Sequence, residues 1–502
     1  MSLFVASLVA LFAFTAVAGL TGSLVVAAIA AIGIALVAGL VVWKRFVRSI
    51  DWAAAPRAFS AASAVAAVVA VVMLARLTVF IVDPSRPSYS VLPGSEWEVR
   101  HSCLTAYFVA ADIVRHVPNV YSLTIYAAPD DDPSKPRKPR TMGVFRIDQY
   151  EYPPPFLLLP RALSLLAPDF LRLRMVWFGL SGLVVLVGLA VVAWHLRGDA
   201  ATRALLLVPF VLGSIITINT MQKGNVQLAV IAVSMIAMVL VERKHSAAGG
   251  ALLAFVTLAK LYPGLLVLYL LVRREWRALV WTAAFALLFL VVTLIDVGWQ
   301  PFVAFRQQFP SLLSGEAFPA FRNPAAVAIN QSIPGLVFKL KLFGVAGMGF
   351  GAARIVGTLY MVFAVALTVV LARRTLRDGQ GPLVWMAILI FATLRSPFLP
   401  QSYAPFPAIW LLTLLVATAA PERRSLALFL VGFIVLNIYV PNDSGIDPRL
   451  LALVSSISQA LTVALAVGVI RRFVMPWNAN LFASPEVFDQ HQIATATHQP
   501  SE

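Results

Sequence analysis

The sequence predicts an all-α, polytopic integral membrane protein with about a dozen transmembrane helices, and three observations support that prediction. Of the 502 residues, 60% are hydrophobic and only 12% are charged, about half of the ~25% charged fraction of a soluble globular protein. The mean hydropathy is +0.85. Apolar runs long enough to cross ~30 Å of hydrocarbon recur from Leu3 to Ile470. This composition excludes an ordinary soluble enzyme.

The charge balance indicates topology rather than nucleic-acid binding. The chain has 39 Lys and Arg against 23 Asp and Glu, a formal net charge of +16. Seven clusters at alternate ends of the apolar runs hold 18 of the 39 basic residues: Lys44, Arg45, Arg48 and Arg57; Arg197 and Arg203; Arg243 and Lys244; Arg273, Arg274 and Arg277; Arg373, Arg374 and Arg377; Arg423 and Arg424; Arg471 and Arg472. Because cytoplasmic loops carry such an excess, these clusters and both termini are predicted to be cytoplasmic.

The first two apolar runs, Leu3–Leu20 and Leu24–Trp43, predict a transmembrane hairpin. No basic residue precedes the first run and the second follows at once, so we interpret them as retained helices rather than a signal peptide. Residues 1–57 are therefore predicted to be an additional N-terminal hairpin, 58–472 the main membrane domain, and 473–502 a disordered cytoplasmic tail.

A long extracytoplasmic loop is predicted at residues 83–169, after a helix at Phe59–Val82. The loop is polar and proline-rich, and loops of this length are usually functional or disordered. Within it, helical spacing of apolar residues predicts a surface-lying amphipathic helix at Ser102–Arg115, and the composition of Pro129–Arg140 predicts a flexible insert.

The remaining crossings follow from hydrophobicity and from the basic clusters between them. The stretch Ala247–Val272 has both ends on the cytoplasmic side and is interrupted at Lys260, Tyr262 and Pro263, which predicts two short helices that meet at Lys260. The other expected crossings are Met175–Leu196, Ala204–Ile218, Val226–Val241, Ala278–Ile295, Ile355–Ala372, Leu383–Phe398, Pro405–Ala419, Leu426–Val440 and Leu450–Ile470.

With this topology, the unusual polar residues gather on the extracytoplasmic side. They are Gln222, Lys223 and Asn225 in one turn; Asn330 and Gln331 in another loop; Arg395, Gln401 and Tyr403 in a third; and Glu96, Glu98, His101, Asp148, Glu151 and Tyr152 in the first loop. If they converge, they line an extracytoplasmic cavity. The alternative for any one of them is a solvated loop residue or a helix cap.

Lys260 is a candidate anion ligand. It lies inside an apolar stretch and has no acidic residue nearer in the sequence than Glu242 and Glu275. An unpaired ammonium within a membrane segment costs several kcal/mol, and a helix break beside it would expose backbone donors that suit a phosphate. The alternative is a lysine that extends its ammonium to the membrane interface.

A general base must be a carboxylate or a histidine within reach of the proton it removes. In the first loop, Glu96, Glu98, Asp148 and Glu151 are candidates, and their spacing singles out none of them. No cofactor and no metal ligand are assigned, and a dependence on a divalent metal is left open. The aspartates at 130–132 precede basic residues without an adjacent histidine and suit a solvated run better than a metal site. Cys103 is the sole cysteine, which excludes an intrachain disulfide. No nucleotide-binding or hydrolase motif occurs in a suitable context.

Five segments in order resemble glycosyltransferase family 87, whose members are membrane C-type glycosyltransferases, over roughly Thr78 to Ala419. The segments are Tyr152-Pro153-Pro154-Pro155-Phe156; Gln222-x-Gly224-Asn225; Ala259-Lys260-Leu261-Tyr262-Pro263-Gly264 with the following Arg273-Arg274-x-Trp276-Arg277; Asn330-Gln331-Ser332-x-x-Gly335; and Ser396-Pro397. The resemblance implies a polyprenyl-phosphate sugar as donor, such as a mannose or arabinofuranose donor, an inverting displacement and a catalytic carboxylate in the first external loop.

The sequence departs from the family pattern at two positions. Alignment on Tyr107–Ala111 places Cys103 where the family has an Asp, and Gln401 to Tyr403 stand where histidines are common. Glu98 is the predicted replacement base and Asp148 the second candidate. Lys260 and Arg395 are predicted to hold the donor phosphate. The other predicted residues of the donor site are Gln222, Lys223, Asn225, Tyr262, Asn330 and Gln331.

The favoured hypothesis is a multi-pass glycosyltransferase of the bacterial inner membrane. It would move one sugar from a polyprenyl-phosphate donor to an envelope glycan or glycolipid on the extracytoplasmic face. The alternatives are a transporter or lipid-linked glycan flippase, since broken helices around a charge also occur in transport sites, and an envelope polysaccharide polymerase or ligase. No nucleic-acid partner is expected.

Overall fold

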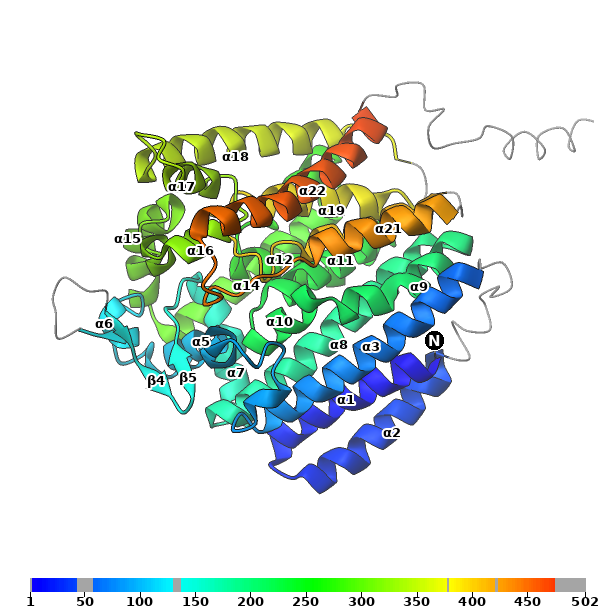
Figure 1. Ribbon diagram of the computed structural model, residues 1–502, viewed down its shortest axis with the longest axis horizontal. Helices are drawn as coiled ribbons and strands as arrows, with labels where there is room; N and C mark the ends of the chain where they lie inside the picture. The colour runs from blue at the N-terminus through cyan, green and yellow to red at the C-terminus, as the bar shows by residue number, and fades with distance from the viewer. Residues whose placement is uncertain (1, 43–56, 130–136, 377–378, 420–422, 475–502) are drawn as a thin grey trace, which may run out of the picture.

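The computed structural model describes residues 2–42, 57–129, 137–376, 379–419 and 423–474. Long helices run side by side, and the first-loop elements β4, β5 and α6 gather at the end of the bundle opposite the N-terminus (Figure 1). Four predicted features lie outside the described residues: the basic residues at 44–48, the aspartates at 130–132, Arg377 of the fifth basic cluster, and the tail from residue 475 onward.

In the described part of the chain, seven helices are long and apolar enough to cross a membrane. They are α1 (Ser2–Thr21), α2 (Leu24–Val42), α3 (Arg57–Val82), α8 (Phe170–Leu196), α14 (Trp276–Val297), α18 (Phe350–Ala372) and α22 (Pro448–Val474). An eighth span results if α9 (Gly198–Gly213) and α10 (Ile215–Lys223), bent by 54°, cross together. The prediction of a helical multi-pass protein is therefore confirmed, but the number of a dozen crossings is not.

Several shorter apolar helices complete the bundle. They are α11 (Gln227–Glu242), α12 (Ser246–Ala259), α13 (Gly264–Val272), α19 (Gly381–Thr393), α20 (Phe406–Thr418) and α21 (Arg423–Leu436). The break between α12 and α13 falls at Lys260, as the sequence predicted. Both α19 and α20 are buried along nearly their whole length, so they form the centre of the bundle rather than its lipid-facing surface.

The two helices of the N-terminal hairpin differ in their packing. Helix α1 packs closely against α8. The two backbones are so near each other at Gly179 of α8 that a Cβ there would lie 2.4 Å from the carbonyl oxygen of Phe12. Small residues permit such contacts between membrane helices. Most of α2 is exposed outside α1. The hairpin is thus joined to the rest of the bundle through α1.

The first loop is more ordered than the sequence predicted. It contains α4 (Glu96–Arg100), α5 (Leu104–Ile113), α6 (Leu123–Tyr126) and α7 (Leu158–Leu166), together with the short strands β1 (His101–Ser102), β2 (Ala127–Ala128), β3 (Lys138–Pro139), β4 (Thr141–Met142) and β5 (Phe145–Ile147). The predicted helix at 102–115 is α5, but it is packed into the core and not laid on the surface. Its sequence is apolar on all sides except for Thr105 and Asp112, which favours burial.

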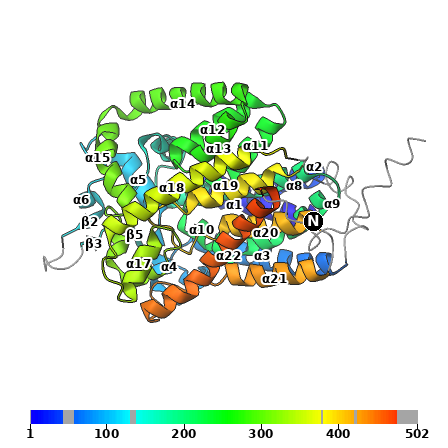
Figure 2. The same ribbon diagram turned by 90° about the horizontal axis from the view of Figure 1, so that it is seen from above.

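The end of the bundle that carries the first loop also carries the segment after α14. This segment contains α15 (Gln300–Ser314), α16 (Pro324–Ala328) and α17 (Gly335–Leu342), which lie at the same end of the bundle as α6 and β5 in both views (Figures 1 and 2). Asp296, near the end of α14, forms ion pairs with Arg115 and Arg161 of the first loop. The two polar segments therefore lie at one end of the molecule.

Candidate active site

The pairing of two first-loop strands brings together residues that are 45 positions apart in the chain. Strands β1 and β5 are parallel, with His101 opposite Arg146 and Ser102 opposite Ile147. The next residues along the two strands are Cys103 and Asp148. The amide N–H of Asp148 donates a hydrogen bond of 3.0 Å to Thr105 Oγ1, and this hydroxyl donates to the carbonyl of Ser102 at 2.7 Å.

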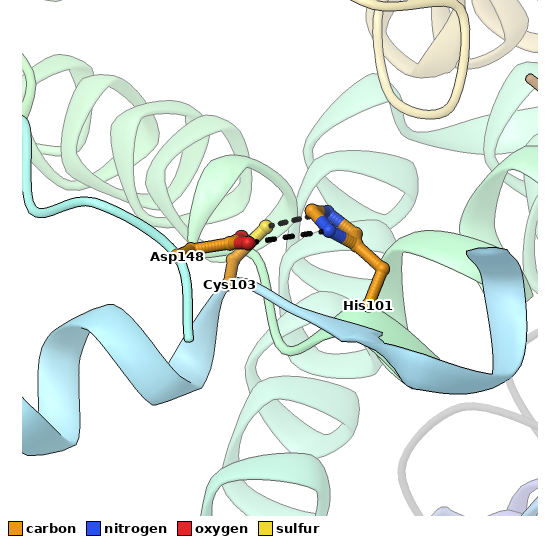
Figure 3. Close-up of side chains that lie close together, drawn as sticks. All are labelled: His101, Cys103 and Asp148. Atoms are coloured by element: carbon orange, nitrogen blue, oxygen red, sulfur yellow. Dashed lines mark hydrogen bonds and ion pairs between the residues drawn. The ribbon is translucent and has the colours of Figure 1, made fainter. Parts of the chain in front are cut away.

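His101, Cys103 and Asp148 form what we call the His101 cluster (Figure 3). His101 Nδ1 lies 3.4 Å from Asp148 Oδ1, and His101 Nε2 lies 3.6 Å from Cys103 Sγ. The imidazole stacks on Trp97 with 4.9 Å between the ring centroids. The side chains of His101 and Asp148 are 17% and 25% exposed, so the cluster is accessible to a small molecule.

The electrostatics of the cluster favour a cation at its centre. Burial lowers the pKa of His101, but the negative charge of Asp148 and that of an ionised Cys103 outweigh this effect and raise it to about 10. Asn225 Nδ2 donates to Cys103 Sγ at 3.4 Å. A thiol or thiolate sulfur, a carboxylate and an imidazole are all metal ligands, and the ligand atoms of these three residues lie within 4.8 Å of one another. The sequence analysis assigned no metal ligand and did not find this group.

Lys260 lies beside this cluster, at the break between α12 and α13. Its Nζ donates a 2.9 Å hydrogen bond to Gln227 Oε1 and lies 5.1 Å and 5.5 Å from the ring centroids of Tyr152 and Tyr403. Among the described residues no carboxylate lies within 4.0 Å of this ammonium. Lys260 interacts electrostatically with Cys103 and Glu151, which places the cation and the first-loop anions in one centre.

Glu151 is the second carboxylate of this centre. Burial raises the pKa of Glu151 well above its usual range, the negative charge of Asp148 raises it further, and Lys260 opposes the rise. Next to it, the hydroxyl of Tyr107 donates to that of Tyr152 at 2.7 Å. Tyr107, Tyr152 and Phe156 have ring centroids 4.8 to 5.0 Å apart and form an aromatic wall.

Glu98, the predicted base, lies in a separate and closed environment. Its side chain is 0% exposed and pairs with Lys223, with 2.9 Å between Glu98 Oε2 and Lys223 Nζ. The hydroxyl of Tyr439 donates to Glu98 Oε1 at 2.5 Å. We call Glu98, Lys223 and Tyr439 the Glu98 group. Oε1 also accepts from Lys223 Nζ at 3.2 Å, whereas Oε2 is held by the ion pair with Lys223 and accepts no hydrogen bond from the described residues.

Gln222 and Asn225 both connect α10 to the first loop. Gln222 Oε1 accepts from the amide of Val91 at 2.7 Å, and its Nε2 donates to the carbonyl of Glu98 at 2.8 Å. Asn225 Oδ1 accepts from the amide of Gln227. Between them, Gly224 ends α10 with φ +67°, the left-handed conformation that glycine adopts readily. The Gln-x-Gly-Asn motif is therefore explained by a helix end that supports the loop.

Asn330 and Gln331 are buried in a different network. Asn330 Oδ1 accepts from the amides of Ser332 and Leu399, and its Nδ2 donates to the carbonyl of Pro397. Gln331 Nε2 donates to the carbonyl of Ser455 in α22. These contacts give Asn330 a structural role, whereas Gln331 retains a buried Oε1 without a hydrogen-bond partner among the described residues. Their motif marks a connection between the loop before α17 and the segment that follows α19.

The other two predicted donor-site residues have unused hydrogen-bonding groups. The hydroxyl of Tyr262 and Nε of Arg395 have no hydrogen-bond partner among the described residues. Arg395 lies at the end of α19, where its guanidinium is 3.1 Å from the position of a Cβ on Gly357 of α18. Both side chains are half-buried, so each can contact a ligand that enters the bundle from this end.

The structure thus places the predicted residues in different environments. Asp148 belongs to the His101 cluster, and Asn225 and Lys260 lie beside it. Glu98 and Lys223 belong to the closed Glu98 group, to which Gln222 is hydrogen-bonded, and Asn330 and Gln331 lie in a separate network. Sequence reasoning named His101, Tyr152 and Tyr403 only as possible lining of a cavity, and it missed Gln227 and Tyr439. Only the strand pairing and the packing of α11 and of the α21 to α22 loop bring these residues to the site.

A family model described as glycosyltransferase family 87 matches residues 150–399. The match includes Lys260, Arg395 and the Gln-x-Gly-Asn motif, and it begins two residues after Asp148. No curated protein and no solved structure matches the chain.

Proposed function

The chain belongs to glycosyltransferase family 87, and we propose that it transfers a sugar from a polyprenyl-phosphate donor to a hydroxyl group of an envelope glycan or glycolipid. The sugar would be a hexose such as mannose, or a pentose. Family membership supports a membrane glycosyltransferase over the transporter or flippase and over the polymerase or ligase that the sequence left open.

We further propose that the end of the bundle with the first loop faces the extracytoplasmic side of a bacterial inner membrane. The basic clusters support this orientation, because those with described positions flank the opposite ends of the same helices. About a dozen crossings would result if the shorter apolar helices also span the bilayer, with both termini in the cytoplasm.

The observation that carries the proposal is that a cation with no carboxylate partner in the described part of the chain shares one centre with two half-buried carboxylates. Lys260 interacts electrostatically with Glu151, and Glu151 with Asp148. Such a centre supplies both groups that an inverting transfer needs: a cation for the departing phosphate and a carboxylate for the acceptor proton. Arg395, Tyr262 and Asn225 are the further donor-site residues that we propose.

In the proposed reaction the acceptor hydroxyl oxygen attacks the anomeric carbon of the donor sugar. The bond between this carbon and the phosphate oxygen breaks, and its electron pair stays on the polyprenyl phosphate next to Lys260. A carboxylate takes the hydroxyl proton. Attack on the face opposite the leaving phosphate inverts the anomeric configuration.

Of the two predicted bases, the geometry favours Asp148. A general base must come within about 2.6–3.2 Å of the proton-bearing oxygen, and the Asp148 side chain is 25% exposed whereas that of Glu98 is 0% exposed. Glu98 would have to leave Lys223 and Tyr439 before it could contact an acceptor. We therefore propose Asp148 as the base and Glu98 as a residue that holds α4 and α10 in position.

The test is incubation of the purified full-length protein with a panel of polyprenyl-phosphate sugars and a crude envelope glycolipid fraction. Consumption of one donor with release of polyprenyl phosphate is the expected result. The Lys260→Met variant should consume that donor more slowly, and Lys244→Met, which removes an exposed lysine paired with Glu275, should not. If the parent protein consumes none of the donors, the proposal is contradicted.

A further inference from the structure

We propose that His101, Cys103 and Asp148 form a binding site for a divalent metal ion of the zinc class. This inference goes beyond the proposed sugar transfer and does not depend on it, because it concerns the binding of an ion. It rests on the geometry of the three side chains, on the elements that hold them and on their combined chemistry.

The separations between the three side chains suit one ion. Zinc lies about 2.3 Å from a cysteine sulfur and about 2.0–2.2 Å from a histidine nitrogen or carboxylate oxygen, so neighbouring ligands of a tetrahedral ion are about 3.5 Å apart. Here the Sγ to Nε2 distance is 3.6 Å and the Nδ1 to Oδ1 distance is 3.4 Å. These two distances end on different ring nitrogens, and an ion would take only one of them. One ligand atom from each residue then lies within 4.8 Å of the other two, so the side chains would draw together around the ion.

Each ligand is held by neighbouring residues in the manner typical of metal sites. Trp97 stacks on the imidazole of His101, and Thr105 accepts from the backbone amide of Asp148. Asn225 Nδ2 donates to Cys103 Sγ. Such outer contacts orient ligands and contribute to metal affinity. Trp97 and Thr105 belong to the first loop, whereas Asn225 follows α10 and is distant from them in sequence.

The chemistry of the ligands selects the class of ion. A thiolate is a soft ligand that favours zinc over magnesium or calcium, and a thiolate with a carboxylate supplies two negative charges for a divalent cation. Three protein ligands with a fourth position open are typical of catalytic rather than structural zinc sites. The half-buried state of all three residues leaves room for that fourth ligand, a water or a substrate oxygen.

The site is compatible with the proposed role of Asp148. A single carboxylate oxygen is sufficient for the ion, and the other oxygen stays available for a proton. A hydroxyl bound at the open position would lose its proton more easily, because a bound divalent ion lowers the pKa of an oxygen ligand. The competing interpretation is a hydrogen-bonded His, Cys and Asp group that binds no ion.

The experiment measures the metal content of the full-length protein, purified in detergent without a polyhistidine tag and equilibrated with zinc before removal of the unbound ion. We expect about one zinc per chain for the parent and background zinc for Cys103→Ala and for His101→Ala. The matched control is His195→Ala, since His195 also contacts a carboxylate, 3.0 Å away on Glu242, but no cysteine. This control should keep the zinc.

Two further measurements keep the inference testable if a ligand variant does not fold. The parent loaded with cobalt should show a sulfur-to-cobalt charge-transfer band, and the conservative variant Asn225→Ala should weaken zinc binding about 10- to 100-fold. Equal zinc in the parent and in a folded Cys103→Ala variant would overturn the inference. So would a cobalt-loaded parent without the charge-transfer band. Because neither readout involves sugar transfer, failure of one proposal is distinguishable from failure of the other.

Discussion

The first loop contains two ionic centres that begin only three residues apart in the sequence, and they differ in almost every physical respect. In the Glu98 group, the carboxylate is 0% exposed and its partner Lys223 is 5% exposed. In the His101 cluster, the imidazole and the carboxylate of Asp148 are 17% and 25% exposed. Glu98 contacts a cation and a hydroxyl, whereas Lys260, near the cluster, has no carboxylate partner among the described residues.

This difference separates a group that holds the fold together from a group that can bind a ligand. A buried charge with all of its partners inside the protein has nothing left for a substrate, and removal of one partner strands the other in a medium of low dielectric constant. A half-buried charge with unused capacity can be completed by a substrate or an ion. The comparison predicts that substitutions in the Glu98 group change stability, whereas substitutions in and around the His101 cluster change activity.

The largest effect is expected for Asp148→Asn. The substitution retains the size of the side chain but removes the proposed base, so the rate of transfer should fall by about 10²- to 10⁴-fold. The melting temperature should stay close to that of the parent, because Asp148 is partly exposed. Donor consumption and a thermal melt in the same detergent measure the two quantities, and a fully active variant would remove Asp148 from the mechanism.

The next largest effect is expected for Lys223→Met. The variant leaves the Glu98 carboxylate buried without its cation, which costs about 3–5 kcal/mol of stability. The double variant Glu98→Gln with Lys223→Met should regain most of that loss. Thermal melts of the two proteins measure this. If Lys223→Met alone were as stable as the parent, the ion pair between Glu98 and Lys223 would not hold α10 against the first loop.

A smaller effect is expected for Lys260→Met. Loss of a hydrogen bond to a charged phosphate costs about 1.5–3 kcal/mol, so KM for the donor should rise about 10- to 100-fold with little change in the melting temperature. Donor titrations measure this value. If KM is unchanged, Lys260 does not hold the donor phosphate, and its contacts with Gln227 and the two tyrosine rings have a structural role.

The smallest effect is expected for Gln222→Ala. It leaves the amide of Val91 and the carbonyl of Glu98 without their present partners, which should lower stability by about 1–3 kcal/mol. The rate of transfer per folded molecule should be unchanged. A pronounced loss of donor affinity with unchanged stability would instead support the contact with donor that the sequence analysis predicted.

The sequence predicted the features that depend on hydrophobicity and local chain order. The helical membrane fold, the break at Lys260 and the family were all readable, because an apolar run, a Tyr-Pro pair and an ordered set of motifs are local signals. The sequence did not predict that the carboxylate of Glu98 is buried and that of Asp148 is accessible. It depends on the register of β1 with β5 and on Tyr439, a residue 341 positions away from Glu98.

The first loop also shows why short elements escape prediction. Strands β1 and β5 have two and three residues, too few for an alternating pattern to appear. Likewise, Asn330 and Gln331 belong to a motif of the family, but only the packed structure shows that their polar atoms bind backbone groups near Pro397 and Ser455.

The most direct test of the contrast between the two centres is the activity of Glu98→Gln, measured per folded molecule under conditions in which the variant remains folded. The proposed assignment predicts a lower melting temperature but a transfer rate within about tenfold of the parent, because removal of a general base would cost far more. A folded Glu98→Gln variant that is as inactive as Asp148→Asn would contradict it and would place the base in the buried Glu98 group.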